Sequence, residues 1–122
     1  MSNGANIARV VIAEDEAIVA FDLSLRLRSM GYDVLAMVSS GEDAIDAARR
    51  YMPDIMLMDI GLKGMDGLTA GRIINRESNI TLFLMSAYSK EIMETDIAGL
   101  PSRGYLCKPF SDYELKSVLG VA

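Results

Sequence analysis

The sequence predicts an α/β fold: a doubly wound, five-stranded parallel sheet with five helices on its two faces. Short apolar runs alternate with longer amphipathic stretches five times along the 122 residues, a pattern typical of strands that alternate with helices. The apolar runs are too continuous for strands exposed on one face, and such strands belong to parallel sheets covered by helices. A chain of this length is expected to form one domain, residues 1–122, with a core at about 9–119 and a lead-in at 1–8.

The first half of the chain predicts two strands and two helices. Strands are expected at 10–13 and 34–38, separated by a helix at 17–30 that ends before Gly31. Apolar residues recur in that helix at helical spacing, in two stripes. The stripes are Ile18, Phe21 and Leu25, and Leu23, Leu27 and Met30. A cap at Ser40 begins the second helix. The residues expected on its inner face are Ala44, Ile45, Ala47 and Ala48.

The second half of the chain continues this alternation. Strands are expected at 54–58, 81–85 and 104–107. Asp66 or Thr69 opens the third helix, and the fourth helix, at about 90–98, is broken by a Gly-Leu-Pro sequence. Ser111 and Glu114 form a capping box for the last helix.

Composition and charge exclude several classes of function. The formal charge of −5, without a basic run, argues against direct nucleic-acid binding and against binding to an anionic membrane. No apolar run is long enough to span a bilayer, and the first ten residues lack the build of a signal peptide. The single cysteine, Cys107, excludes an internal disulfide and is predicted to be an inert core thiol. We therefore expect a cytoplasmic protein, and the absence of histidine excludes histidine catalysis and most zinc catalysis.

Charged or hydroxyl side chains follow four of the five predicted strands. They are Glu14, Asp15 and Glu16 after the first strand, Asp59 after the third, Ser86 after the fourth and Lys108 after the fifth. Ligands of an open parallel α/β sheet bind beyond the carboxyl ends of its strands, so we expect these side chains to share one site. Each residue alone has a simpler explanation, such as an acidic first helical turn, a turn serine or a solvated lysine. Their coincidence at one edge of the sheet favours a functional site.

The residue types in this set indicate metal-assisted phosphoryl chemistry. Carboxylates gathered at one point repel each other and therefore call for a divalent cation. A ligand set of oxygen atoms, without histidine or cysteine, favours Mg²⁺. Lys108 would add a fixed positive charge, and Ser86 would add a hydroxyl donor. A carboxylate in such surroundings can itself be phosphorylated by in-line attack.

Four segments resemble the receiver domain of the bacterial response-regulator family. VVIAEDE, residues 10–16, is similar to the family's first strand and acidic pair, and LMDIGLKGMDG, residues 57–67, resembles its phosphoacceptor segment. LMSAYS, residues 84–89, resembles the hydroxyl segment, and GYLCKPF, residues 104–110, resembles the lysine segment. The resemblance covers residues 9–119 and implies the flavodoxin-like (βα)5 receiver fold.

This resemblance implies a phosphoacceptor and a metal site. Asp59 would accept a phosphoryl group from a histidine kinase or a phosphotransfer protein. Mg²⁺ would be bound by Asp15 and Asp59 directly, by Glu14 through water, and by the carbonyl of Gly61.

The same resemblance implies a switch around the phosphoryl group. Ser86 and Lys108 would contact the phosphoryl oxygens, and the small side chain of Ala87 would leave the pocket open. Tyr105 would be the aromatic residue that changes position. The peptide bond between Lys108 and Pro109 would be cis and would aim the lysine into the site.

Three positions mark departures from the family pattern. Lys63 stands four residues after the acceptor, where the family often has proline, so the loop is expected to differ in shape. Gly61 offers no side chain over the phosphoryl group, whereas Tyr88 is bulky. Both resemble positions that tune the lifetime of the phosphoryl group.

The implied function is a two-state signalling switch that turns over no separate substrate. Phosphorylation would alter the face formed by the fourth helix, the fifth strand and the fifth helix. A downstream protein would bind this face, which would also allow a phosphorylation-linked homodimer. Residues 109–122 leave room for one helix, so a stand-alone receiver is expected rather than one trimmed from a longer regulator.

Three other classes fit the residues less well. An aspartyl phosphatase would carry a DxDxT motif, whereas residues 59–63 are Asp-Ile-Gly-Leu-Lys. A pseudo-receiver would lack the acceptor, an acid or the lysine, and this chain has all of them. A mononucleotide carrier would need a phosphate-cradling loop after the first strand, where residues 14–16 are acidic and would repel phosphate.

Overall fold

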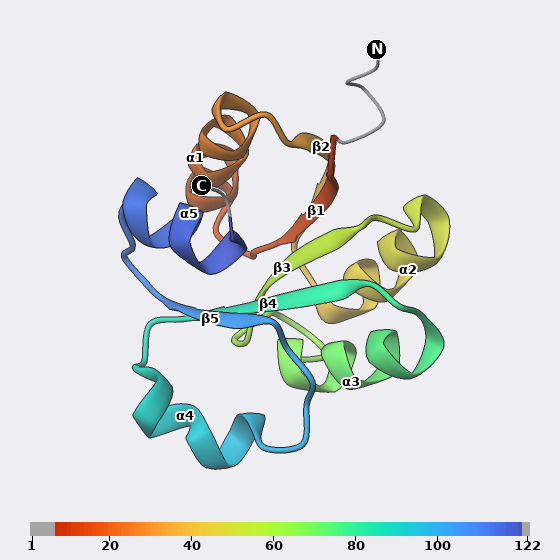
Figure 1. The fold of residues 1–122 in the computed structure, drawn as a ribbon. Coiled ribbons are helices and arrows are strands. Elements are labelled where there is room, and N and C mark those ends of the chain that lie inside the picture. The colour runs from red at the N-terminus through yellow and green to blue at the C-terminus, as the bar shows by residue number, and fades with distance from the viewer. Residues whose placement is uncertain (1–6, 121–122) are drawn as a thin grey trace.

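The computed structural model describes residues 7–120, so most of the predicted lead-in at 1–8 lies outside the described residues. Within this described range, five strands alternate with five helices (Figure 1). The strands are β1 (Arg9–Ala13), β2 (Asp33–Val38), β3 (Ile55–Asp59), β4 (Thr81–Ser86) and β5 (Gly104–Cys107). The helices are α1 (Ala17–Ser29), α2 (Gly41–Tyr51), α3 (Gly67–Glu77), α4 (Lys90–Ile97) and α5 (Asp112–Leu119).

All neighbouring strands are parallel, in the order β2-β1-β3-β4-β5. Helices α1 and α5 cover one face of the sheet, and α2, α3 and α4 cover the other (Figure 1). Two apolar layers therefore form the core, one on each face. This is the predicted doubly wound α/β fold.

The central strands are buried, but the two edge strands are not. β1, β3 and β4 are buried throughout except at their first residues. The expectation that no strand is half exposed is wrong for β2, where Met37 is 44% exposed. β2 has a neighbour on one side only, and the helices that cover the centre of the sheet leave part of an edge strand open.

Only one of the two apolar stripes of α1 enters the core. Leu23 and Leu27 are buried against the sheet. Ile18, Phe21 and Leu25 are 85%, 56% and 50% exposed. A helix that packs on one face of a sheet buries a single stripe, so the second stripe of α1 remains on the surface.

Side-chain caps define where four of the helices begin. Ser40, Asp66, Ser89 and Ser111 each accept a hydrogen bond from a backbone N–H in the first turn of the following helix. Asp66, not Thr69, opens α3, and the predicted capping box of Ser111 and Glu114 is present. Such caps satisfy backbone N–H groups that a helix leaves without partners.

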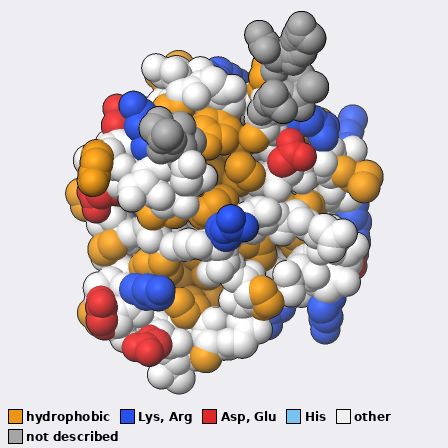
Figure 2. Space-filling model, in the orientation of Figure 1, with side chains coloured by type: hydrophobic (Ala, Val, Ile, Leu, Met, Phe, Trp, Pro, Cys, Tyr) orange, Lys and Arg blue, Asp and Glu red, His pale blue; other side chains and the backbone are white. Residues whose placement is uncertain are grey.

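The visible surface is mixed in charge. On the face drawn in Figure 2, Lys and Arg side chains lie around the outline and near the middle, and apolar side chains show mainly in the middle of the face. Among residues 7–120, no helix has both the length and the apolar character needed to cross a membrane.

Candidate phosphoacceptor and metal site

The predicted polar residues lie at the carboxyl ends of four parallel strands. Asp59 is the last residue of β3 and Ser86 the last of β4, while Glu14 and Asp15 follow β1 and Lys108 follows β5. The register pairs Asp59 with Met85 and Ser86 with Cys107. Parallel register therefore brings together side chains that are far apart in the sequence.

Three carboxylates form a cluster that could hold a metal ion. Oxygen atoms of Glu14, Asp15 and Asp59 all lie within 4.8 Å of one another. Glu14 and Asp59 are buried, and Asp15 is partly exposed. The set offers oxygen ligands only, which fits a hard divalent cation such as Mg²⁺.

Lys108 lies between two of these carboxylates. Its Nζ donates to Glu14 Oε1 and to Asp59 Oδ2, at 2.5 Å each. The lysine side chain is 17% exposed, and that of Glu14 is fully covered. One ammonium thus opposes three carboxylates and leaves two negative charges unbalanced, which a divalent cation would neutralise.

The environment shifts the pKa values of two of these groups. Burial raises the pKa of Glu14, and the hydrogen bonds from Lys108 and from the Glu16 N–H offset this only in part. Burial also lowers the pKa of Lys108, but the hydrogen bonds to Asp59 and Glu14 outweigh it and raise the pKa above its ordinary value. Lys108 is therefore a fixed positive charge at neutral pH.

The backbone around Asp59 is tightly packed. The Gly61 N–H donates to Asp59 Oδ1 at 2.8 Å, and the Gly67 N–H donates to the Ile60 carbonyl at 2.8 Å. A Cβ atom on Gly67 would lie 2.1 Å from the Asp59 carbonyl oxygen, so only glycine fits there. That the Gly61 carbonyl would bind the metal ion remains a prediction.

A chain of hydrogen bonds leads from Ser86 to Tyr105. Buried Ser86 accepts a hydrogen bond at Oγ from the Tyr88 N–H at 3.0 Å. The Tyr88 carbonyl in turn accepts from the Tyr105 hydroxyl at 2.6 Å. Burial raises the pKa of Tyr105. Ala87, which lies between Ser86 and Tyr88, is exposed. The peptide bond between Lys108 and Pro109 is cis.

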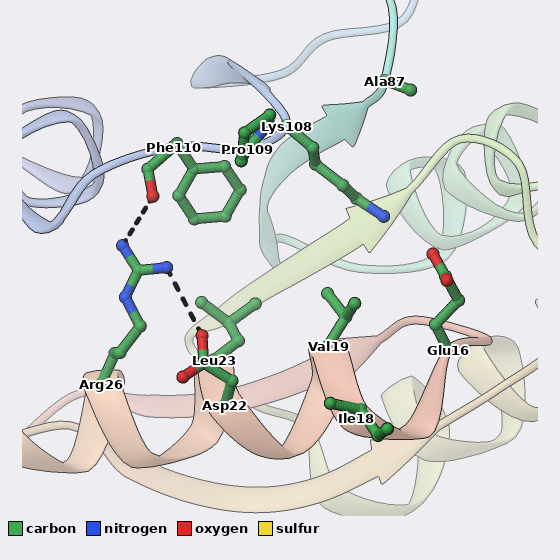
Figure 3. A pocket seen from close by; sticks show the side chains of 10 residues that line it. All are labelled: Glu16, Ile18, Val19, Asp22, Leu23, Arg26, Ala87, Lys108, Pro109 and Phe110. Carbon is green, nitrogen blue, oxygen red and sulfur yellow. Dashed lines mark hydrogen bonds and ion pairs between the residues drawn. The ribbon is translucent and has the colours of Figure 1, made fainter.

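A groove of about 500 Å³ opens beside Lys108, between α1 and the loop that follows β5 (Figure 3). The α1 side includes Ile18, Val19 and Leu23. On the other side lie Pro109 and Phe110, whose carbonyl accepts a hydrogen bond from Arg26 of α1. Sequence reasoning missed Arg26 and Phe110, because nothing in an amphipathic helix shows which arginine meets a loop 84 residues later.

The prediction that Cys107 is a core thiol is wrong, because this side chain is exposed. Cys107 is the last residue of β5, an edge strand of the sheet. Its apolar sequence neighbours indicated a buried strand, but burial in an edge strand varies from residue to residue, and only Leu106 of β5 is buried.

Sequence comparisons with known proteins find a matching family model and a relative. A family model described as the response regulator receiver domain matches residues 10–120. The transcriptional regulatory protein PdtaR of Mycobacterium tuberculosis is 31% identical over 114 residues. That match covers 93% of this chain and 56% of PdtaR, so the chain spans little more than half the length of this relative.

Solved structures of similar fold include two receiver domains. The receiver domain of a modulated diguanylate cyclase from Desulfovibrio desulfuricans G20 has a TM-score of 0.85 and 29% identity, over 94% of this chain and 92% of the other. The receiver domain of sensor histidine kinase PA1611 from Pseudomonas aeruginosa PAO1 has a TM-score of 0.81 and 27% identity, over 93% and 94%. The latter structure contains a magnesium ion coordinated in its active-site cleft.

Proposed function

This chain belongs to the response regulator receiver domain family, and we propose that Asp59 accepts a phosphoryl group from a histidine kinase or a phosphotransfer protein. The observation that carries the proposal is the position of the Asp59 carboxylate, which lies against Lys108 and within an oxygen-only acidic cluster. The receiver would act as a cytoplasmic signalling domain of a two-component system, and it would turn over no separate substrate.

The proposed reaction is an in-line displacement at phosphorus. A carboxylate oxygen of Asp59 forms a bond to the phosphorus of a phosphohistidine, the P–N bond breaks, and its electron pair stays on the imidazole nitrogen. Lys108, which binds an Asp59 oxygen before the reaction, then pairs with a phosphoryl oxygen of the acyl phosphate. Mg²⁺, which would be held directly by Asp15, Asp59 and the Gly61 carbonyl and through water by Glu14, would neutralise charge on the phosphoryl group.

The switch would start at Ser86. Ser86 would donate its hydroxyl to a phosphoryl oxygen, and a movement of Ser86 toward Asp59 would draw with it the Tyr88 N–H that binds its Oγ. Because the Tyr88 carbonyl is the partner of the Tyr105 hydroxyl, this movement reaches the α4–β5 surface. A partner that binds one arrangement of Tyr105 more tightly would then respond to phosphorylation.

The surface of α1 supports a protein phosphodonor. Ile18, Phe21 and Leu25 form an exposed apolar stripe, and Ile18 also lines the groove beside Lys108. A phosphodonor protein that covered this stripe would bring its phosphohistidine to the sheet edge that holds Asp59. We place the downstream partner, a protein or a second copy of this chain, at the α4–β5–α5 face, where Ile92 and Tyr113 are exposed.

The test is the intact mass of the protein after incubation with acetyl phosphate and Mg²⁺. We expect one phosphoryl adduct on the wild type, no adduct on Asp59→Asn, and no adduct when a chelator removes Mg²⁺. An equal adduct on Asp59→Asn would overturn the acceptor assignment. A folded wild type without any adduct would instead favour an interaction module without phosphoryl chemistry.

A further inference from the structure

Arg26 ties α1 to the loop that carries the site lysine. Its Nη2 donates to the Phe110 carbonyl at 2.9 Å, and its Nε donates to Asp112 Oδ1 at 2.6 Å. The guanidinium also lies over the Phe110 ring, 5.1 Å from the centroid, and near Asp22 at 3.7 Å. Figure 3 shows Arg26 reaching across the end of the groove toward Phe110.

The segment held by Arg26 begins at Lys108. The Lys108 N–H is bound to the Ser86 carbonyl at 2.7 Å, where the β4–β5 pairing ends. The Lys108 carbonyl accepts only a long hydrogen bond, of 3.9 Å, from the Cys107 thiol in the described chain, and the next hydrogen bond to the backbone of this segment is the one from Arg26 to the Phe110 carbonyl. Exposed Pro109 lies between these two anchors. The main chain from which the Lys108 side chain extends is thus fixed at one end by the sheet and at the other by Arg26.

We propose that Arg26 is a positioning residue that holds Lys108 in the geometry required for phosphoryl transfer to Asp59. This inference rests on the proposed function. A planar guanidinium can satisfy the carbonyl, the carboxylate and the ring face at once, whereas a lysine ammonium on a flexible stem cannot. Small displacements of a charged group at a reacting centre lower the reaction rate. A loop loosened by the loss of Arg26 would therefore lower the rate of phosphoryl transfer to Asp59, because Lys108 would no longer be held in place.

The experiment compares Arg26→Met and Arg26→Lys with the wild type, using Arg28→Met as the control. Arg28 lies on the same helix, and its side chain makes one hydrogen bond within residues 7–120, of 3.5 Å, to the Val34 carbonyl. We measure the initial rate of phosphorylation by acetyl phosphate at saturating Mg²⁺, and the exchange of the Lys108 ammonium protons by NMR.

We expect a rate about 3- to 30-fold lower for Arg26→Met, little rescue by Arg26→Lys, and a wild-type rate for Arg28→Met. The ammonium signal of Lys108 should be protected from exchange in the wild type and in Arg28→Met, and lost in Arg26→Met. The affinity for Mg²⁺ should not weaken in any of the variants, because Arg26 contacts none of the carboxylates in the cluster.

A wild-type rate together with a protected Lys108 signal in Arg26→Met would overturn the inference. If Arg26→Met does not fold, Arg26→Lys decides the question by the same two measurements. If the wild type takes up no phosphoryl group, the proposed function fails, and the exchange of the Lys108 protons alone decides whether Arg26 positions the lysine.

Discussion

At the scale of single residues, the reactivity proposed for Asp59 depends on a lysine shared between two carboxylates. Lys108 binds both Glu14 and Asp59. These are also two of the three carboxylates that a divalent cation would need. The ammonium therefore opposes the cation electrostatically, although the phosphoryl group would benefit from both.

Replacing Lys108 should separate these two effects. In Lys108→Met, the affinity for Mg²⁺ is expected to rise by roughly tenfold, because a positive charge beside the cation is removed. The rate of phosphorylation by acetyl phosphate should fall at the same time. Titration with Mg²⁺, followed by NMR shifts of the Gly61 amide, checks the first expectation. An affinity for Mg²⁺ weaker than that of the wild type would contradict it.

A second residue-scale prediction concerns Met52, at the end of α2. Its φ of 46° is in the left-handed region, and its side chain is 72% exposed. Met52→Gly relieves about 1–2 kcal/mol of backbone strain against a cost of up to about 1 kcal/mol in unfolded-state entropy. We expect a net gain of about 0.5–1 kcal/mol in the free energy of unfolding, measured by denaturant titration. Met52→Ala keeps the Cβ and should show no gain; an equal gain would argue against strain.

At the scale of elements, the loop after β3 is held by the first turn of α2. The Met65 N–H donates to Glu42 Oε1 at 3.1 Å, and Ser40 pairs with Lys63 in an isolated bridge. A Cβ atom on Gly41 would lie 2.1 Å from the Met65 carbonyl oxygen. Lys63 therefore takes part in a backbone pairing at the position where the family often has proline.

This contact predicts a role for Glu42 in the affinity for Mg²⁺. Glu42→Ala should weaken binding by about threefold, which is less than the loss caused by removing a direct partner of a metal ligand. Glu42→Gln keeps an oxygen acceptor and should bind like the wild type, and Asp43→Asn controls for the loss of charge. If Glu42→Gln and Asp43→Asn both bind as weakly as Glu42→Ala, charge rather than the tether is responsible.

The pairing of α2 with α3 predicts a dependence on pH. Arg49 binds both carboxylate oxygens of Glu77, and this hydrogen bonding lowers the pKa of Glu77 below its ordinary value of 4.5. A lowered pKa stabilises the fold above the unfolded-state value, and this stabilisation is lost as the pH falls through the folded-state value. Glu77→Gln should therefore melt below the wild type at pH 7 and match it in acid. A gap in melting temperature that persisted in acid would exclude this cause.

At the scale of the whole molecule, the strands and the cluster of site residues could be predicted from the sequence. The exposure of the edge strands and the contacts between distant segments could not. Continuous apolar runs predicted the five strands, and the rule that ligands bind at strand carboxyl ends predicted the cluster of Glu14, Asp59 and Lys108. Edge position could not be predicted from these runs, so the exposure of Met37 and Cys107 was missed. Contacts such as that of Arg26 with Asp112 depend on tertiary packing between distant segments.

The exposed apolar stripe of α1 predicts a docking surface for the phosphodonor protein. Ile18→Ser and Phe21→Ser should lower phosphotransfer from a phosphorylated histidine kinase by about tenfold or more if they remove central interface contacts. Phosphorylation by acetyl phosphate, which needs no docking surface, should not change. Met37→Ser, on the exposed edge strand β2, is the matched control. Equal losses with the kinase and with acetyl phosphate would show damage to the site instead of lost docking.

The central claim, that Asp59 carries the phosphoryl group, can be tested by locating the acyl phosphate chemically. Borohydride reduces an aspartyl phosphate to homoserine, which peptide mass spectrometry assigns to a position. After treatment with acetyl phosphate and Mg²⁺, we expect homoserine at position 59 and aspartate retained at position 15. Homoserine at position 15, or at neither position in protein that carries a phosphoryl adduct, would contradict the account.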